Sequence, residues 1–278
     1  MKILVTGSNG MLGSDLSEIL CQKHEVFTLT KDNLDITDRE KTIKTVKSAN
    51  TDILINCAAY TMVDQAEKEK ELAFTINGIG VQNVALACEE SRIPLCHIST
   101  DYVFDGRKST PYTPFDNTNP INAYGESKLA GEKYIQWISS KFYIVRSSWL
   151  YGKSRNNFVR TIQKLCKEKD ELKIVADQIG SPTWTVTLSG GISRLIETGA
   201  FGVYNITDDA GEGISWFEFA KEIVAASGSK AKVSPISTED YPTLAKRPRY
   251  SVLDISLNKK MFGFAAGRWS EALREFLK

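Results

Sequence analysis

The chain has 278 residues, enough to bury a substantial core as one large domain or two. Its 35 Lys and Arg residues balance 34 Asp and Glu residues, so it lacks the charge expected of a partner for nucleic acid or an anionic membrane. No apolar run approaches the ~20 residues that span a bilayer. The five cysteines are scattered without a Cys-x-x-Cys pair, which predicts reduced thiols in a cytoplasmic protein rather than disulfides or zinc.

The first expected element is a short apolar strand that runs directly into three glycines. Lys2–Thr6 precedes a G-x-x-G-x-x-G pattern, and a helix-like stretch follows at 11–21. A strand, a glycine turn and a helix aim backbone N–H groups at a pyrophosphate, although glycines also serve tight turns that bind nothing. The position of the pattern predicts dinucleotide binding. The residues assigned to it are Gly7, Asn9, Gly10, Met11, Leu12 and Gly13.

Strand-like runs alternate with helix-like stretches up to about residue 150. The expected strands are Ile3–Thr6, Val26–Thr30, Ile53–Asn56, Leu95–Ser99 and Phe142–Arg146. The expected helices lie near 11–21, 38–49, 69–91 and 123–139. This alternation predicts an α/β fold, a Rossmann-type doubly wound parallel sheet with helices on both faces. We place this dinucleotide-binding domain at residues 1–151.

The remainder, residues 152–278, is expected to form a smaller C-terminal region that mainly binds substrate and partly rejoins the first domain. Its pattern is less regular. The expected helices lie near 156–169, 185–198, Ser215–Ala226 and 269–277, the strands at Leu172–Val175 and Gly202–Thr207, and a loop at Asp177–Thr183.

The second strand ends without a carboxylate, which bears on the choice of nicotinamide cofactor. An NAD-selective site usually has Asp or Glu there to accept from the ribose 2′-OH, whereas a cation accommodates a 2′-phosphate. Here Thr30 would not repel the phosphate and Lys31 could bind it. We therefore expect NADP(H), with NAD(H) possible. Asp32 could take the NAD role if the strand ran longer.

The carboxyl ends of the other strands carry most of the remaining candidates, because ligands bind there in parallel sheets. The cofactor residues assigned to these ends are Cys57, Ala58, Ala59, Tyr60 and Ser99. Tyr124 and Lys128 lie four residues apart, on one face of a helix. A cation lowers the pKa of a nearby phenol, which is otherwise about 10, so Tyr124 is predicted to be a general acid. The Thr100 hydroxyl could hold the same carbonyl oxygen. A solvated Tyr–Lys pair is the alternative.

These residues together resemble the extended short-chain dehydrogenases/reductases, and within them the dTDP-4-dehydrorhamnose reductases. The Tyr-x-x-x-Lys element is shared by the whole superfamily, whereas the Ile98–Gly106 and Arg247–Ser251 blocks are more specific. The matching motifs are the glycine loop, Leu34–Thr37, Asn56–Glu67, Ile98–Gly106, Tyr124 with Lys128, Arg146–Gly152, Asp177–Thr183 and Arg247–Ser251.

The resemblance implies reduction of the C4 keto group of a dTDP-4-keto-6-deoxy sugar to dTDP-L-rhamnose, in nucleotide-sugar and polysaccharide biosynthesis. It implies that Tyr124 gives the proton, that Lys128 also holds the nicotinamide ribose, and that Asp101 joins Thr100 near the sugar. It adds Asp35 and Ile36 to the cofactor residues. The substrate residues that it implies are Thr100, Asp101, Tyr102, Trp149 and Arg247.

Several of these residues could instead have purely structural roles, with no part in binding or catalysis. Trp149 could be core, Arg247 could belong to a surface loop, and Asp64 and Glu67 are expected to be first-turn charges on a helix. Some members of the family are dimers bridged by magnesium, and Asp15 could match one ligand. The segment Trp184–Ser189 lacks the other carboxylates, so we expect no metal and a monomer, a weak homodimer being the alternative.

Two other functions remain open. A related nucleotide-sugar epimerase or 4,6-dehydratase shares the fold, but a dehydratase needs an Asp-Glu pair after the catalytic Thr, and here Tyr102 follows Asp101. A non-catalytic NADP-binding regulatory subunit, as in methionine adenosyltransferase, is the rival from another class. The intact Thr100, Tyr124 and Lys128 disfavour it.

Overall fold

A six-stranded parallel sheet forms the centre of the molecule. The computed structural model describes residues 1–278, and the strands follow the order β10-β5-β4-β3-β1-β2, with every neighbouring pair parallel. Their bounds are β1 Lys2–Thr6, β2 Glu25–Leu29, β3 Ile53–Asn56, β4 Leu95–Thr100, β5 Phe142–Ser147 and β10 Gly202–Asn205. The predicted α/β sheet is confirmed. Its strand order reverses between β1 and β3, and such folds bind ligands at this point.

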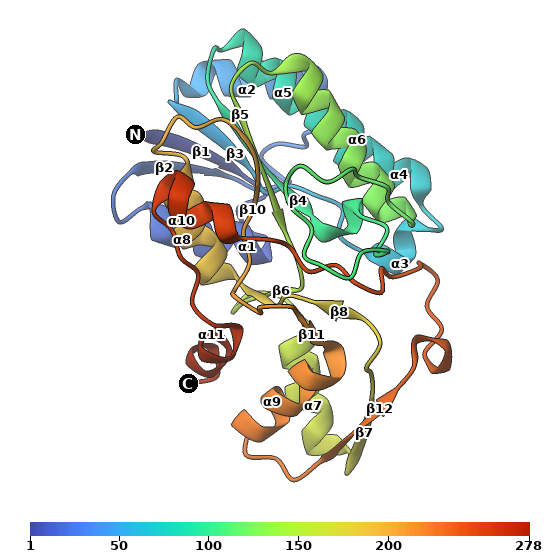
Figure 1. Ribbon diagram of the computed structural model, residues 1–278. Coiled ribbons are helices and arrows are strands. Elements are labelled where there is room, and N and C mark those ends of the chain that lie inside the picture. Colours follow the sequence, from blue (N-terminus) through green and yellow to red (C-terminus); the bar gives the residue numbers. More distant parts are fainter.

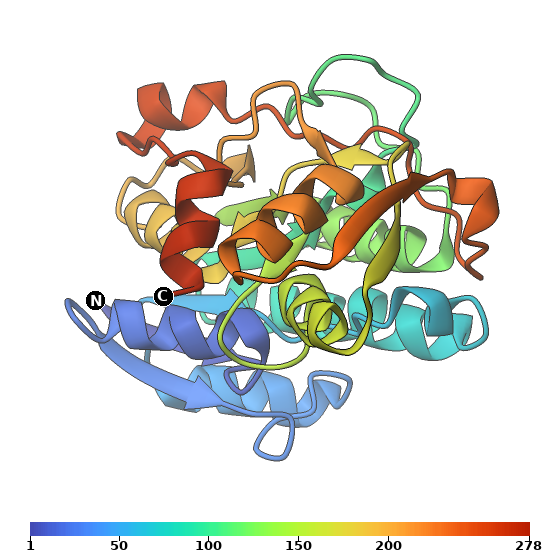
Figure 2. The ribbon, with the colours of Figure 1, turned by 90° about the horizontal axis from the view of Figure 1, so that it is seen from below.

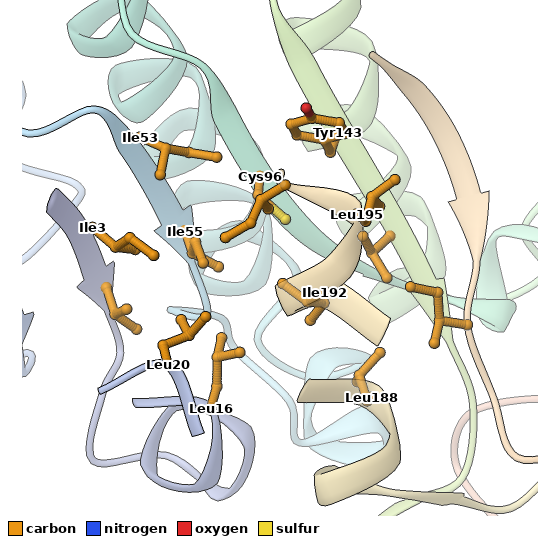
Figure 3. Close-up of a cluster of buried hydrophobic side chains, with 14 of the residues drawn as sticks. Ile3, Leu16, Leu20, Ile53, Ile55, Cys96, Tyr143, Leu188, Ile192 and Leu195 are labelled. Carbon is orange, nitrogen blue, oxygen red and sulfur yellow. The ribbon is translucent and has the colours of Figure 1, made fainter. Parts of the chain in front are cut away.

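Different helices cover the two faces of the sheet (Figure 1). One face carries α1 Met11–Leu20, α8 Thr185–Leu195 and α10 Ser256–Phe262, and the other carries α2 Arg39–Ala49, α5 Val81–Glu90 and α6 Ala123–Ile138. Successive strand side chains point to opposite faces. Ile53 and Ile55 therefore pack with α1 and α8, as Figure 3 shows, while Leu54 packs with α5. A strand buried on both faces must be apolar throughout, which explains the uninterrupted Ile-Leu-Ile run.

The stretch expected as one helix near 69–91 contains a change of helical type. It runs as α4 Lys70–Phe74, a π-helical segment Thr75–Gly80, and α5. The segment holds the buried Asn77, whose Oδ1 accepts from the Tyr60 N–H at 2.8 Å and whose Nδ2 donates to the Tyr60 carbonyl at 2.9 Å. The side-chain amide thus fixes the loop after β3. No periodicity of apolar residues could have predicted the π-helical turn, because it serves a polar contact.

A smaller body with its own core lies beside the main sheet. Its core includes Tyr151, Phe219 and Leu273. Its elements are α7 Phe158–Glu168, α9 Trp216–Ala226, α11 Trp269–Phe276 and three two-stranded sheets, pairing β7 Glu171–Val175 with β12 Lys232–Ile236, β6 Leu150–Tyr151 with β9 Thr183–Trp184, and β8 Ile179–Gly180 with β11 Ile214–Ser215. Strand β12 was not expected because it is short, polar and contains Pro235.

No helix of the chain is both long and apolar enough to cross a membrane.

Asp208 is a fully buried carboxyl group behind the junction of the two bodies. Its Oδ2 accepts from the Trp184 N–H at 2.9 Å, and its Oδ1 has no hydrogen-bond partner. Burial disfavours the charged form and raises the pKa of Asp208 from 3.8 to about 7. Since the folded pKa lies above the unfolded one, the stability contributed by the protonated group is lost as the pH rises through about 7.

We therefore expect Asp208→Asn to raise the free energy of unfolding at pH 8 by about 1–3 kcal/mol, because a neutral amide replaces an under-paired buried charge. The effect should shrink towards pH 5. Urea unfolding at both values measures it. Asp209→Asn, at an exposed neighbour, is the control and should change neither value. Equal effects of Asp208→Asn at the two pH values would contradict the assignment.

Candidate active site

A cleft of about 680 Å³ opens at the carboxyl ends of β1, β3, β4 and β5, a volume suited to a small-molecule ligand. The smaller body, which carries α7 and α9, lies in front of the main sheet when the molecule is seen from below (Figure 2). Among the predicted site residues, those that line the cleft are Gly10, Met11, Leu12, Gly13, Cys57, Ala59, Ser99, Thr100, Asp101, Tyr102, Tyr124, Lys128 and Trp149. Those that do not are Gly7, Asn9, Thr30, Lys31, Asp35, Ile36, Ala58, Tyr60 and Arg247.

The glycine loop is built for close approach between chain segments. Gly7 has φ 66°, and a Cβ there would meet the Ala58 nitrogen at 2.5 Å, so the loops after β1 and β3 can touch only through glycine. A Cβ on Gly13 would lie 2.4 Å from the Gly7 carbonyl oxygen. Helix α1 starts after Gly10 with no side-chain cap, which leaves its first N–H groups free for an anion. These residues fit a dinucleotide diphosphate.

The segment after β4 holds a buried, partly satisfied carboxyl group. Thr100 Oγ1 donates to Asp101 Oδ1 at 3.0 Å and accepts from the Tyr102 N–H at 3.2 Å. The other carboxylate oxygen of Asp101 has no partner. Burial raises the pKa of Asp101 to about 7, against the lowering effects of Ser251 and Thr100. At neutral pH this group therefore exists in both protonation states, so it can donate or accept a hydrogen bond in the cleft.

Tyr124 lies in the first turn of α6, whose N-cap Asn122 accepts from the Gly125 N–H. The Tyr102 and Tyr124 rings meet edge to face, with centroids 5.8 Å apart. Burial raises the pKa of Tyr124 above its ordinary value, with hydrogen bonding from Thr100 acting in the opposite direction. The predicted lowering of this pKa by Lys128 is thus wrong for this structure, because burial of the phenol raises it. A raised pKa keeps the phenol protonated, as a proton donor requires.

Lys128 is 2% exposed, and its Nζ lies against strand β4. It donates to the Ile98 carbonyl at 2.6 Å and lies 3.3 Å from His97 Nε2. Burial lowers the pKa of Lys128 to about 8, while Glu132 and Cys57 act to raise it. Such a lysine exchanges its proton near neutral pH. His97 lies inside the expected strand Leu95–Ser99, and nothing in the sequence connects it with Lys128.

A buried ion pair lies directly behind these residues. Arg146 on β5 donates from Nε to Glu132 Oε1 at 3.0 Å and from Nη2 to Glu132 Oε2 at 2.7 Å. Ser99 Oγ donates to the same carboxylate. Ser99 was predicted to contact the cofactor. Ser99 lines the cleft, but its hydroxyl donates to Glu132 and so joins β4 to α6.

Trp149 takes part in an aromatic stack at the rim of the cleft. It has φ 46°, and its ring lies parallel to Trp216 with centroids 3.5 Å apart. A Cβ at Gly180 would come within 2.5 Å of the Trp149 ring, so this glycine makes room for it. One ring face is thus occupied by protein. Trp216 also lines the cleft and had no signal in the sequence, because it comes from the distant helix α9.

Arg247 is bound within the protein rather than open to the cleft. It donates from Nη1 to Asp64 Oδ1 at 2.9 Å and from Nη2 to Asp64 Oδ2 at 2.7 Å, so diphosphate binding would require this pair to open. Asp64 does lie in the first turn of a helix, as expected, but it also binds Arg247, and the expectation is wrong for Glu67. Glu67 follows α3 Val63–Ala66, and its Oε1 accepts from the Ala123 N–H at the start of α6.

Strand β2 ends at Leu29, one residue earlier than predicted, so Asp32 is not at its end. The Thr30 N–H and hydroxyl both bind Asn33 Oδ1, at 3.1 and 3.0 Å. Lys31 is exposed beside Asp35, and its charge contributes to lowering the pKa of that carboxyl group, after hydrogen bonding from Thr37. Ile36 is buried in the core, so its side chain is not available to a ligand.

The loop after β6 supplies residues that the sequence did not single out. Arg155 has φ 65° and donates from Nε and Nη2 to the carbonyl of Asn9, at 3.2 and 3.0 Å. It therefore brings a cation from the smaller body to the glycine loop. The polar run Ser154–Asn157 was the only feature of the sequence that could have pointed to this loop. The lining residues missed by the sequence are Thr61, Val63, Ile98, Ser147, Ser148, Leu150, Arg155, Asn156, Asn157 and Trp216.

Asp15, the one candidate for a metal-bridged dimer, is used inside the fold. It is 7% exposed on α1 and accepts a hydrogen bond from Thr185 on α8. The structure holds no group of three or more His, Cys, Asp or Glu side chains placed to bind a metal ion.

Comparison with known proteins covers the whole chain. Residues 1–278 match the family model described as RmlD substrate binding domain. The dTDP-4-dehydrorhamnose reductase of Aggregatibacter actinomycetemcomitans is 38% identical, over 98% of this chain and 97% of that protein.

Comparison with solved structures points to the same family. The dTDP-4-dehydrorhamnose reductase of Clostridium acetobutylicum has a TM-score of 0.96 and 42% identity, covering 100% of this chain and 98% of that one. That of Bacillus anthracis, in complex with NADP, has a TM-score of 0.95 and 44% identity, covering 99% and 98%. The chain therefore belongs to the RmlD substrate binding domain family, that of the dTDP-4-dehydrorhamnose reductases.

Proposed function

We infer that the chain is an NADPH-dependent oxidoreductase that reduces the C4 keto group of dTDP-6-deoxy-L-lyxo-4-hexulose to dTDP-L-rhamnose. The observation that carries this function is the meeting of Thr100, Tyr124 and Lys128 in the cleft that the glycine loop also lines. Relatives named for this activity match almost the full length, and the Bacillus anthracis relative was solved with NADP.

The protein residues handle the proton and the carbonyl oxygen. Tyr124 gives its phenolic proton to the C4 oxygen as the carbon is reduced, and its raised pKa keeps that proton in place until then. The Thr100 hydroxyl turns from Asp101 to donate to the same oxygen. Lys128 restores the proton to Tyr124 and holds the ribose hydroxyls of the cofactor. A nicotinamide bound in the cleft would supply the hydride.

The sugar would lie between the segment after β4 and the Trp149–Trp216 stack, both of which line the cleft. Asp101 and Tyr102 would contact its hydroxyl groups, and Trp149 would offer an apolar edge to the ring. Arg247 would bind the diphosphate after release from Asp64. We further propose that the enzyme acts as a monomer, since Asp15 is taken up by Thr185 within the chain.

Two basic residues are assigned different roles in cofactor binding. Lys31, exposed beside the end of β2, would bind the 2′-phosphate that distinguishes NADPH from NADH. Arg155 would bind the diphosphate that both cofactors share, because its guanidinium group already contacts the glycine loop. The two residues should therefore affect cofactor binding in distinguishable ways.

Replacing Tyr124 by Phe should lower kcat about 10²–10⁴-fold while leaving the Kd for NADPH nearly unchanged, because only the proton donor is lost. NADPH oxidation with the dTDP-4-keto sugar measures the first quantity and titration of the free enzyme the second. Tyr134→Phe, on the same helix but outside the cleft, is the matched control. If Tyr124→Phe retained more than a tenth of the activity, Tyr124 would not be the proton donor.

The Lys31→Ala variant should raise KM for NADPH roughly ten- to a hundredfold and leave KM for NADH almost unchanged. The reason is that a charge-assisted contact to phosphate is worth about 1.5–3 kcal/mol. Lys41→Ala removes another exposed lysine whose charge acts on Asp35, and serves as the control. A preference of the unmutated enzyme for NADH would overturn the assignment of Lys31.

For Arg155 the informative change is to glycine, which adopts φ 65° without strain and so removes only the side chain. Arg155→Gly should raise the Kd for NADPH and NADH by the same factor, roughly tenfold. Calorimetric titration of the free enzyme measures both constants. Lys153→Ala, an exposed cation in the same loop, should change neither. A loss confined to one cofactor would be inconsistent with a diphosphate contact.

A further inference from the structure

A line of buried polar side chains crosses the sheet from β1 to α6. Asn56 and His97 are both 0% exposed. Asn56 Oδ1 accepts from Thr6 Oγ1 at 2.6 Å and from the Ala58 N–H at 3.2 Å. A backbone N–H can only donate, so these two bonds fix which end of the Asn56 amide is oxygen. Its Nδ2 must then be the atom that lies 3.1 Å from His97 Nδ1.

The orientation of this amide determines where the proton of the imidazole lies. An amide nitrogen donates and cannot accept, so His97 Nδ1 must be the acceptor and carry no hydrogen. Complete burial is the main cause that lowers the pKa of His97 well below its ordinary value, so the ring is neutral. A neutral imidazole without hydrogen on Nδ1 carries it on Nε2.

That Nε2–H faces Lys128. The distance from Nε2 to Nζ is 3.3 Å, and Nζ also donates to the Ile98 carbonyl at 2.6 Å. An ammonium group has three donors and no acceptor, so with a charged lysine two donors would oppose each other in a dry interior. With a neutral amine, Nζ accepts from Nε2–H through its lone pair while still donating to Ile98. Only this state gives the His97 Nε2–H an acceptor.

We propose that His97 is a positioning residue for Lys128: its Nε2–H, fixed by Asn56 and Thr6, donates to Nζ and favours the neutral amine. The inference rests on the proposed function, in which Lys128 passes a proton to Tyr124. In each turnover the substrate oxygen takes the Tyr124 proton, the phenolate takes one from the Lys128 ammonium group, and the amine takes one from solvent. By favouring the amine, His97 makes the ammonium group a better proton donor.

The other groups that face Lys128 do not account for a neutral amine. Cys57 at the end of β3 has a pKa raised by burial to about 12, so its thiol is uncharged. Tyr124, one turn earlier on α6, is also uncharged. Glu132, one turn later, would favour the ammonium form, but its carboxylate is bound by Arg146 and Ser99. Burial and the imidazole are what oppose the charge.

The chain contains only two histidines, which makes the proposal directly measurable. In ¹⁵N-imidazole NMR spectra of the cofactor-free protein, His97 should show a bare Nδ1 and a protonated Nε2 on both sides of the Lys128 transition, because its buried ring stays neutral. Its Nε2 shift should move through an inflection near the Lys128 pKa of about 8. The second histidine, His24, lies near Glu197 and provides an internal reference in the same spectra.

Two variants separate this role from plain packing. Lys128→Met should abolish the inflection and keep the tautomer, because Asn56 still donates. Asn56→Asp replaces the donor by an acceptor, so it should move the proton to Nδ1 and raise the inflection by about one pH unit or more. A His97 with hydrogen on Nδ1 in the unmutated protein, or an inflection that survives Lys128→Met, would overturn the proposal. Because no substrate is present, neither result depends on the reaction assigned to the enzyme.

Discussion

The buried pair of Glu132 and Arg146 is the interaction on which the geometry of the site depends. It is almost completely removed from water, with side-chain exposures of 0% for Glu132 and 4% for Arg146. Such a pair is tolerated only where further hydrogen bonds satisfy it. Ser99 donates to the carboxylate, the Pro114 carbonyl accepts from the guanidinium group, and the Phe104 ring lies 5.1 Å from it.

Each partner in this network belongs to a different part of the site. Glu132 is one turn beyond Lys128 on α6, and Ser99 is next to Thr100 on β4. A shift of α6 along the sheet would therefore break charge-assisted bonds in the interior. The pair fixes the relative positions of the phenol, the ammonium group and the threonine hydroxyl, which come from two separate elements.

Much of the architecture could be predicted from the sequence, because buried parallel strands are apolar on both faces and end where their apolar runs end. The glycine loop and the spacing of Tyr124 and Lys128 were informative for the same reason: backbone sterics and helix geometry act locally. Contacts between distant segments were not predictable. The Arg247–Asp64 pair, the Trp149–Trp216 stack and the raised pKa of Tyr124 all depend on which segments meet in three dimensions.

The position of β10 at the edge of the main sheet has a consequence for synthesis of the chain. Until Gly202–Asn205 leaves the ribosome, β5 ends the sheet with unpaired backbone groups. Until α8, which precedes β10 in the chain, has also been synthesised, the face that carries Ile3 and Tyr143 lacks its cover of Leu188 and Ile192. A nascent chain of about 150 residues thus contains most of the nucleotide-binding domain but cannot complete its sheet. It exposes an unpaired strand edge and an apolar face of the sheet, both of which favour aggregation. Ribosome-bound intermediates of this length are the ones that a chaperone would need to protect.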